Sequence, residues 1–124
     1  MTTHPIANLN GAGPVWKCPE GLQQLIEAGE ENLVAEVIEI FKNQTVTRLR
    51  LLRNAVEQGR MNEARAQAHT IKGGGRQVGA ERLADVCELI EMGAVGEEET
   101  AALVSQAEAL FQEECRFMVV LQQA

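Results

Sequence analysis

Residues 68–91 read AHTIKGGGRQVGAERLADVCELIE, and the spacing of small, apolar and glycine residues in this stretch indicates the fold class. Apolar residues recur three or four positions apart on both sides of Gly79, as on one face of an α-helix. The residues on these two faces are Ala64, Ala68, Ile71 and Val78, then Leu83, Val86, Cys87 and Ile90. The stretch therefore predicts the end of one amphipathic helix and the whole of the next.

The same periodicity continues outward in both directions. It predicts helices over residues 20–28, 30–58, 62–77, 81–92 and 97–122, ended by Gly29, Gly59, Gly79 and Gly93. Asn62 is expected to cap the helix that follows it, and three glutamates, 97–99, suit the positive end of the last helix. The longest helix is expected to bury a stripe of Leu33, Val37, Phe41, Thr45, Leu49, Leu52 and Val56.

Long helices joined by short loops predict antiparallel neighbours. We therefore expect an all-α fold, an antiparallel up-down-up-down four-helix bundle with a short extra N-terminal helix. Residues 1–19 hold all three prolines and are expected to form an irregular arm, and residues 20–124 the bundle domain. Hydrophobic residues make up 45% of the chain and aromatic residues only 3%, which suits packed helices better than a β-sandwich.

The composition argues against several classes of function. A formal charge of −7 argues against nucleic-acid binding, which needs clustered Lys and Arg. No run of 18 apolar residues and no signal-peptide pattern is present, so we expect a cytoplasmic chain with no membrane partner. Three widely spaced cysteines fit no zinc site and are expected to be reduced thiols. A monomer is the default expectation.

His69 is expected on the helix side opposite to the apolar stripe. Lys72 and Gly73 follow three and four positions later, which places them beside the imidazole on one helix surface. Arg65 and Arg76 fall on the same side, so the spacing predicts a basic stripe that attracts an anion or an acidic partner. No carboxylate lies three or four positions from His69. An exposed histidine beside a cation and bare backbone is typical of a group that another protein must reach.

The glycine run at 73–75 interrupts a helical pattern, and each glycine costs about 0.5–1 kcal/mol relative to alanine. Gly73 is expected to clear the approach to the ring, and Gly75 to permit close contact between helices. Gly74 has no assigned role. The run is not a nucleotide-binding loop, because Gly-x-x-x-x-Gly-Lys-[Ser/Thr] is absent.

Residues 68–91 resemble the signature of the histidine-containing phosphotransfer (HPt) domain family of two-component phosphorelays. The matching positions are Ala68, His69, Ile71, Lys72 and Gly73, then Gly79 and Ala80, then Leu83, Cys87, Ile90 and Glu91. The family commonly has Ser or Ala where this chain has Gly74 and Gly75, a departure that could loosen the helix locally.

The resemblance implies that His69 accepts a phosphoryl group, through Nε2, from a receiver-domain aspartate and passes it to another receiver aspartate. The implied partners are response-regulator receiver domains and a hybrid sensor histidine kinase. Such a carrier is not an enzyme, has no ATP site and needs no cofactor, and the Mg²⁺ belongs to the receiver. Lys72 is expected to contact the phosphoryl oxygens. Gly73, Arg65 and Arg76 are expected to assist docking of the receiver or to provide additional positive charge. Leu22 and Ile26 are candidates for an apolar docking patch.

Two other hypotheses remain open at the level of the sequence. A module that docks to receivers or kinases without accepting phosphate would share the fold but would not need His69. A bundle that holds a metal or cofactor in its core would need inward Glu and Glu-x-x-His sets, and neither His4 nor His69 is preceded by a glutamate at that spacing.

Overall fold

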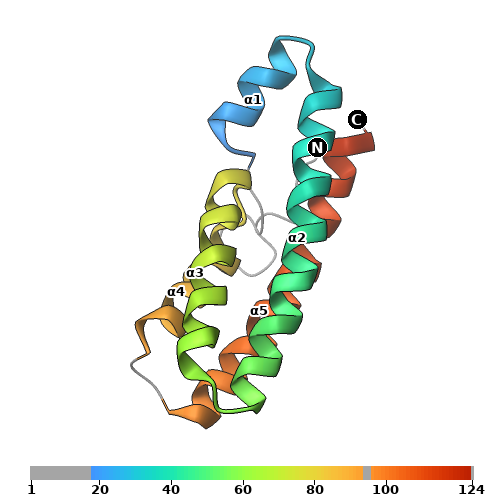
Figure 1. Ribbon diagram of the computed structural model, residues 1–124. Coiled ribbons are helices and arrows are strands. Elements are labelled where there is room, and N and C mark those ends of the chain that lie inside the picture. Colours follow the sequence, from blue (N-terminus) through green and yellow to red (C-terminus); the bar gives the residue numbers. More distant parts are fainter. Residues whose placement is uncertain (1–17, 94–95, 124) are drawn as a thin grey trace, which may run out of the picture.

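The computed structural model describes residues 18–93 and 96–123, which form five α-helices. They are α1 (Glu20–Glu27), α2 (Glu31–Glu57), α3 (Met61–Val78), α4 (Glu81–Met92) and α5 (Glu97–Gln123). The last four run alternately down and up, so that helices adjacent in sequence are antiparallel (Figure 1). The predicted all-α bundle with a short extra N-terminal helix is therefore confirmed.

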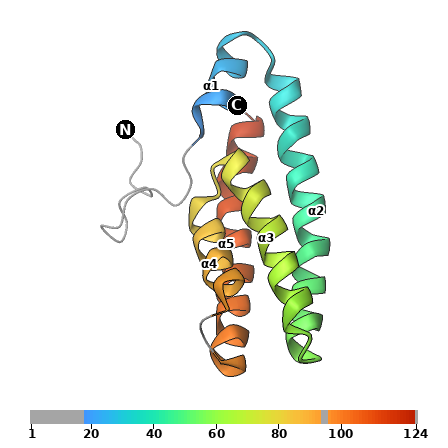
Figure 2. The same ribbon diagram turned by 60° about the vertical axis from the view of Figure 1, so that its left-hand side comes forward.

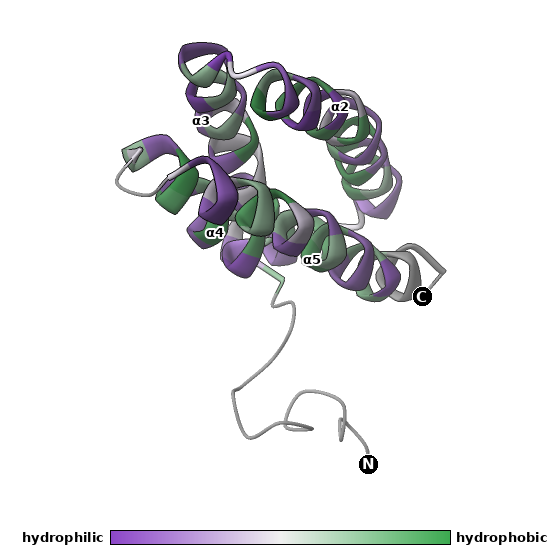
Figure 3. Cartoon of the chain, turned by 90° about the horizontal axis from the view of Figure 1, so that it is seen from below, coloured by the Kyte–Doolittle hydropathy of each residue, from purple (hydrophilic) through white to green (hydrophobic). Residues whose placement is uncertain are grey.

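The four long helices form a closed ring around one interior. α3 packs against α2 and α4, and α5 packs against the same two helices from the opposite side. Figure 3 shows this arrangement from below, and Figures 1 and 2 show α1 beside the upper end of α2. The outer side of α3 is thus flanked by α2 on one edge and by α4 on the other.

Glycine ends four of the helices, as the sequence predicts. Gly29, Gly59, Gly79 and Gly93 all have positive φ, a region that L side chains rarely adopt. At Gly79 (φ 84°), the N–H of Ala80 donates to the C=O of Gly75 at 2.8 Å, which closes a Schellman motif. This motif sets the angle at which α4 turns back along α3.

The predicted cap at Asn62 is wrong. α3 begins at Met61, its N-cap is Arg60, and no side chain caps it. The N–H of Arg60 donates to the C=O of Ala55 at 2.8 Å, so the end of α2 already sets the conformation of the turn. Only three residues separate the helices, and Asn62 falls inside α3.

The predicted core is confirmed along most of its length. Buried residues include Ala64, Ala68, Ile71 and Val78 of α3, Leu83, Val86, Cys87 and Ile90 of α4, and Phe41, Thr45, Leu49, Leu52 and Val56 of α2. The first two turns of α2 differ: Val34 and Ile38 are buried, Leu33 is 42% exposed and Val37 is half-buried. Both neighbouring stripes are apolar there, so packing, not periodicity, determines which faces inward.

Residues 1–17 lie outside the described part of the chain, so the irregular arm and the domain boundary at residue 19 stay predictions.

The described residues also bear on the cysteines, on membrane spans and on metal sites. Cys18, Cys87 and Cys115 are free, and burial raises the pKa of Cys87 to about 12. None of the helices over residues 18–93 and 96–123 is long and apolar enough to cross a bilayer. Within the same residues, no group of three or more His, Cys, Asp or Glu could hold a metal ion.

Candidate functional site

His69 lies on the outward side of α3. Its side chain is 67% exposed, whereas Ala68 and Ile71 on the opposite side of the helix are buried. One turn further on, a Cβ built at Gly73 would meet nothing within 4 Å. The ring is therefore open to an approaching molecule, and its exposure and the open space at Gly73 agree with the sequence-based expectation.

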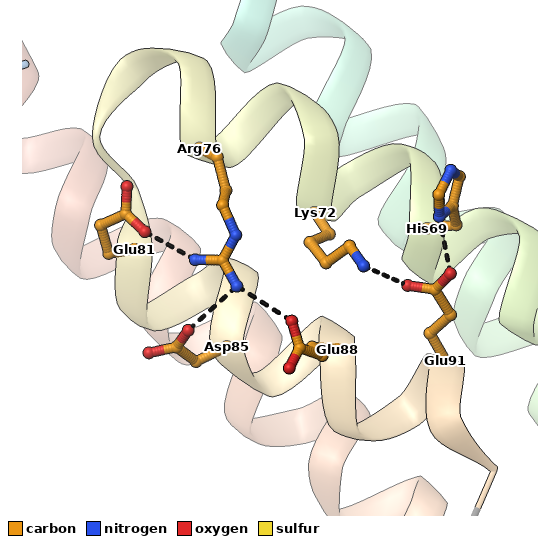
Figure 4. Close-up of polar contacts among 7 residues, drawn as sticks. All are labelled: His69, Lys72, Arg76, Glu81, Asp85, Glu88 and Glu91. Carbon is orange, nitrogen blue, oxygen red and sulfur yellow. Dashed lines mark hydrogen bonds and ion pairs between the residues drawn. The ribbon is translucent and has the colours of Figure 1, made fainter.

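Glu91 on α4 contacts both functional side chains that the sequence predicts on α3 (Figure 4). Its Oε2 lies 2.6 Å from Nδ1 of His69, and its Oε1 lies 2.7 Å from Nζ of Lys72. Lys72 first, and His69 next, lower the pKa of the Glu91 carboxyl below its usual value, although burial opposes them. Glu91 is thus held as a carboxylate that accepts a hydrogen bond from His69 and forms an ion pair with Lys72.

The contact with Glu91 selects one tautomer of the imidazole. A carboxylate can only accept, so Nδ1 of His69 must carry the proton that it donates. In a neutral ring, Nε2 is then left with the free lone pair. Figure 4 shows the second ring nitrogen on the side away from Glu91. The nucleophilic atom is therefore the one that faces outward.

Inspection of positions three and four residues from His69 could not find Glu91, which lies 22 residues further along the chain. A signal was nevertheless present. In a hairpin of antiparallel helices, residues equally far from the turn lie opposite each other. His69 and Glu91 are equidistant from Ala80, the second of the two residues between α3 and α4. Their pairing thus follows from the hairpin once its turn is placed.

Arg76 lies two turns beyond His69 on the same side of α3, and its side chain extends over the outer edge of α4. Its guanidinium contacts Glu81 at 2.6 Å, and Asp85 and Glu88 at 3.2 Å each (Figure 4). The hydrogen bond that Arg76 donates to Glu81, followed by those it donates to the other two carboxylates, raises the pKa of Arg76, while burial opposes the increase. This cluster ties the C-terminal half of α3 to α4.

Two of the three cations predicted to form a basic stripe, Lys72 and Arg76, are paired with acidic groups. Arg65 reaches the C-terminal end of α4, where its Nε lies 2.9 Å from the position that a Cβ on Gly93 would take. Lys72 is paired with Glu91, and Arg76 with three carboxylates. Four carboxylates thus face Lys72 and Arg76, so this edge of the site is not the positive surface that the sequence predicts.

Leu22 and Ile26 do not form the expected apolar docking patch. Leu22 is 7% exposed, and Ile26 is partly buried against the same core. Exposed apolar side chains are spread over α2 and α4 instead, and one of them, Ile40, lines a groove of about 230 Å³ between α2 and α3. The sequence contained a signal for this surface on α2. The apolar residues of that helix form two stripes, which together cover more of the helix than one buried face requires.

Comparison with known proteins identifies the family of the chain. Residues 36–117 match the family model described as Hpt domain, which covers more than half of the chain. The fold is similar to the crystal structure of histidine-containing phosphotransfer protein B (HptB) from Pseudomonas aeruginosa PAO1, with a TM-score of 0.72 and 26% identity. The alignment covers 86% of this chain and 96% of that one. No curated protein matches the chain.

Proposed function

The chain belongs to the Hpt domain family, and from this premise we propose that it is a phosphorelay intermediate whose phosphoacceptor is His69. Proteins of this family carry phosphoryl groups in two-component signalling. In the proposed reaction, His69 takes the phosphoryl group from an aspartate of one receiver domain and later gives it to an aspartate of another. A hybrid sensor histidine kinase is the proposed upstream source.

A single observation carries the proposal: an imidazole that is 67% exposed has its inner nitrogen held by Glu91. Attack by Nε2 forms an N–P bond while the O–P bond of the aspartyl phosphate breaks, and the aspartate leaves as a carboxylate. The ring becomes cationic during this step, and Glu91 beside Nδ1 stabilises that charge. Reversal of the same step returns the phosphoryl group to a receiver.

Lys72 is the proposed contact for the transferred group. Its ammonium lies 2.7 Å from Glu91, on the same helix face as His69 and one turn away. A phosphoryl group on Nε2 adds negative charge that competes with Glu91 for this ammonium. Phosphoryl transfer depends mainly on positioning and charge stabilisation, and a lysine provides both as a mobile point charge.

The other functional assignments follow from the proposed transfer. The chain acts as a carrier with no ATP site, and the Mg²⁺ required for transfer is bound by the receiver. Gly73 leaves room for the receiver's active-site loops, and Arg65 and Arg76 support the surface from the α4 side. A monomeric, cytoplasmic chain remains the prediction from the sequence.

The proposal is tested by transfer of labelled phosphate from a receiver domain charged with acetyl phosphate. We expect label that is acid-labile and base-stable on the unaltered chain, and none on His69→Gln. His4→Gln is the matched control, because it removes the other histidine of the chain and should keep the label.

Two results would contradict the proposal. Label retained in His69→Gln would place the phosphoacceptor elsewhere. Receiver binding without transfer, under conditions that charge another Hpt protein, would identify a docking module instead.

A further inference from the structure

The outward face of α4 carries an apolar patch made of Leu89 and Met92. The two residues are three positions apart and therefore lie on one side of the helix, and they are 50% and 64% exposed. We infer that this patch binds part of residues 1–17, the segment that precedes the first described residue, Cys18. The inference is independent of the proposed function and goes beyond it.

The patch is not part of the bundle core. α4 packs against α3 and α5 through its other faces, and Met92 is the most exposed large apolar side chain in the described residues. Single exposed apolar residues are common on soluble proteins. Two adjacent ones form a surface whose burial is favourable, because the free energy gained is proportional to the apolar area removed from water.

The segment joins the described chain beside the same helix. Cys18 and Glu20 line a pocket together with Gly79 and Glu81, which is the first residue of α4. In Figure 2, α1 lies above the first turn of α4. The patch begins eight residues further along this helix, about 12 Å along its axis. Six extended residues span about 20 Å, so residues 12–17 alone are long enough to reach it.

The sequence of residues 1–17 suits an apolar patch in an acidic protein. The segment contains Ile6, Leu9, Val15 and Trp16, and it has Lys17 but no Asp or Glu. The chain as a whole carries a formal charge of −7. An aromatic side chain buries about 150–250 Å², enough to cover two neighbouring side chains. The segment therefore combines apolar area with the opposite charge.

The surroundings of the patch are acidic. Glu81, Asp85 and Glu88 lie along the same outer side of α4, are 56%, 70% and 50% exposed, and all pair with Arg76. Three carboxylates and one guanidinium leave this side negative, so it attracts the segment that contains Lys17. Covalent attachment gives the segment a high effective concentration at the patch. Charge, apolar area and reach thus favour the same occupant.

The fluorescence of Trp16 tests the inference, because the chain has no other tryptophan. The test compares the unaltered chain with Leu89→Asp and Met92→Asp, and Leu51→Asp is the matched control. Leu51 is 44% exposed on α2, which lies across the bundle from α4 (Figure 3). The emission maximum reports the polarity around the indole, and quenching by acrylamide reports its accessibility. Circular dichroism checks that each variant is folded.

We expect Trp16 of the unaltered chain to emit at a shorter wavelength, and to be quenched more weakly, than in a peptide of residues 1–17. Each α4 variant should lower the equilibrium constant for binding of the segment by about 10-fold or more, because a charge replaces a buried apolar group. Emission and quenching should then approach the values of the peptide. Leu51→Asp should change neither. No phosphoryl transfer is measured, so the outcome is separate from that of the proposed function.

Two results would overturn the inference directly: equal quenching of Trp16 in the unaltered chain and in the peptide, or weak quenching that persists in both α4 variants. Weak quenching that appears only as the chain concentration rises would also overturn it, because the contact would then be with a second copy.

Discussion

Glu91 positions the two side chains on which the proposed chemistry depends. It accepts from Nδ1 of His69 at 2.6 Å and pairs with Lys72 at 2.7 Å. A carboxylate in this place both selects the tautomer and balances the charge of the ring. Glu91 contacts His69 through Nδ1 and not through the nucleophilic Nε2, so it acts as a positioning residue.

Removal of the Glu91 carboxylate should change the tautomer of His69. In Glu91→Ala, we expect more of the neutral ring to carry its proton on Nε2, which blocks the nucleophilic lone pair. Labelling by phosphoramidate should fall about 10-fold, the lower end of the range for partners that orient a histidine. Nitrogen-15 NMR of the imidazole measures the tautomer ratio directly.

The matched control for Glu91→Ala is Glu88→Ala, because Glu88 lies on the same helix and contacts Arg76 rather than the histidine. An identical tautomer ratio in Glu91→Ala and the unaltered chain would contradict the positioning role.

At the scale of elements, the three glycines of α3 occupy three different surroundings. A Cβ at Gly73 would meet open space, and one at Gly74 would touch Phe41 at ordinary contact distance. A Cβ at Gly75 would lie 3.2 Å from the backbone O of Ala80 and 3.6 Å from Cβ of Ala84. Only Gly75 is therefore required for the close approach of α3 and α4.

Alanine substitutions at positions 73 and 75 should have opposite effects on stability. Gly73→Ala should raise the free energy of unfolding by about 0.5–1 kcal/mol, because alanine is the better helix former. Gly75→Ala should lower it by about 1–3 kcal/mol, because the added methyl group crowds the backbone of the α3–α4 turn. Urea unfolding measures both, and stabilisation of equal size in the two variants would show that the turn accommodates the methyl group.

At the scale of the whole molecule, the bundle buries one carboxyl group of α5 completely. Glu114 is 1% exposed, and neither oxygen makes a well-formed hydrogen bond within the described part of the chain. Burial raises its pKa to about 7, aided by Glu113. The side chain of Arg82 and the backbone amides of Arg82 and Leu83, at the start of α4, oppose the increase. Folding therefore changes the proton affinity of this group.

The buried carboxyl predicts a specific pH dependence. Its pKa is about 7 in the folded chain and 4.5 in the reference state, so the folded chain binds the proton more tightly between these values. The contribution of this group to the free energy of unfolding is therefore greatest below about pH 4.5. It falls as the pH rises and becomes constant above about pH 7.

Glu114→Gln should remove this dependence, because the amide resembles the protonated acid and does not ionise. At pH 8 the variant should be more stable than the unaltered chain by about 2–3 kcal/mol, and near pH 4.5 the two should be similar. Denaturant unfolding at several pH values measures the difference. A constant difference across this range would contradict the assignment.

Local properties of the chain were sufficient to predict the fold. A period of 3.6 residues identified the helices, and Gly29, Gly59, Gly79 and Gly93 marked their ends, because glycine adopts positive φ without a steric penalty. The positions of His69, Lys72 and Gly73 on one outward face followed from the same period. These inferences succeeded because each depends on residues within one or two turns of one another.

Only the tertiary structure decided how the helices face one another. It placed Glu91 between His69 and Lys72, paired Arg76 with α4, buried Leu22, and turned Val34 inward in place of Leu33. Each outcome depends on the rotation and axial register of a helix relative to its neighbours. A shift of one residue turns a helix by about 100°, and the packing of the whole core, not any local pattern, determines which rotation is lowest in energy.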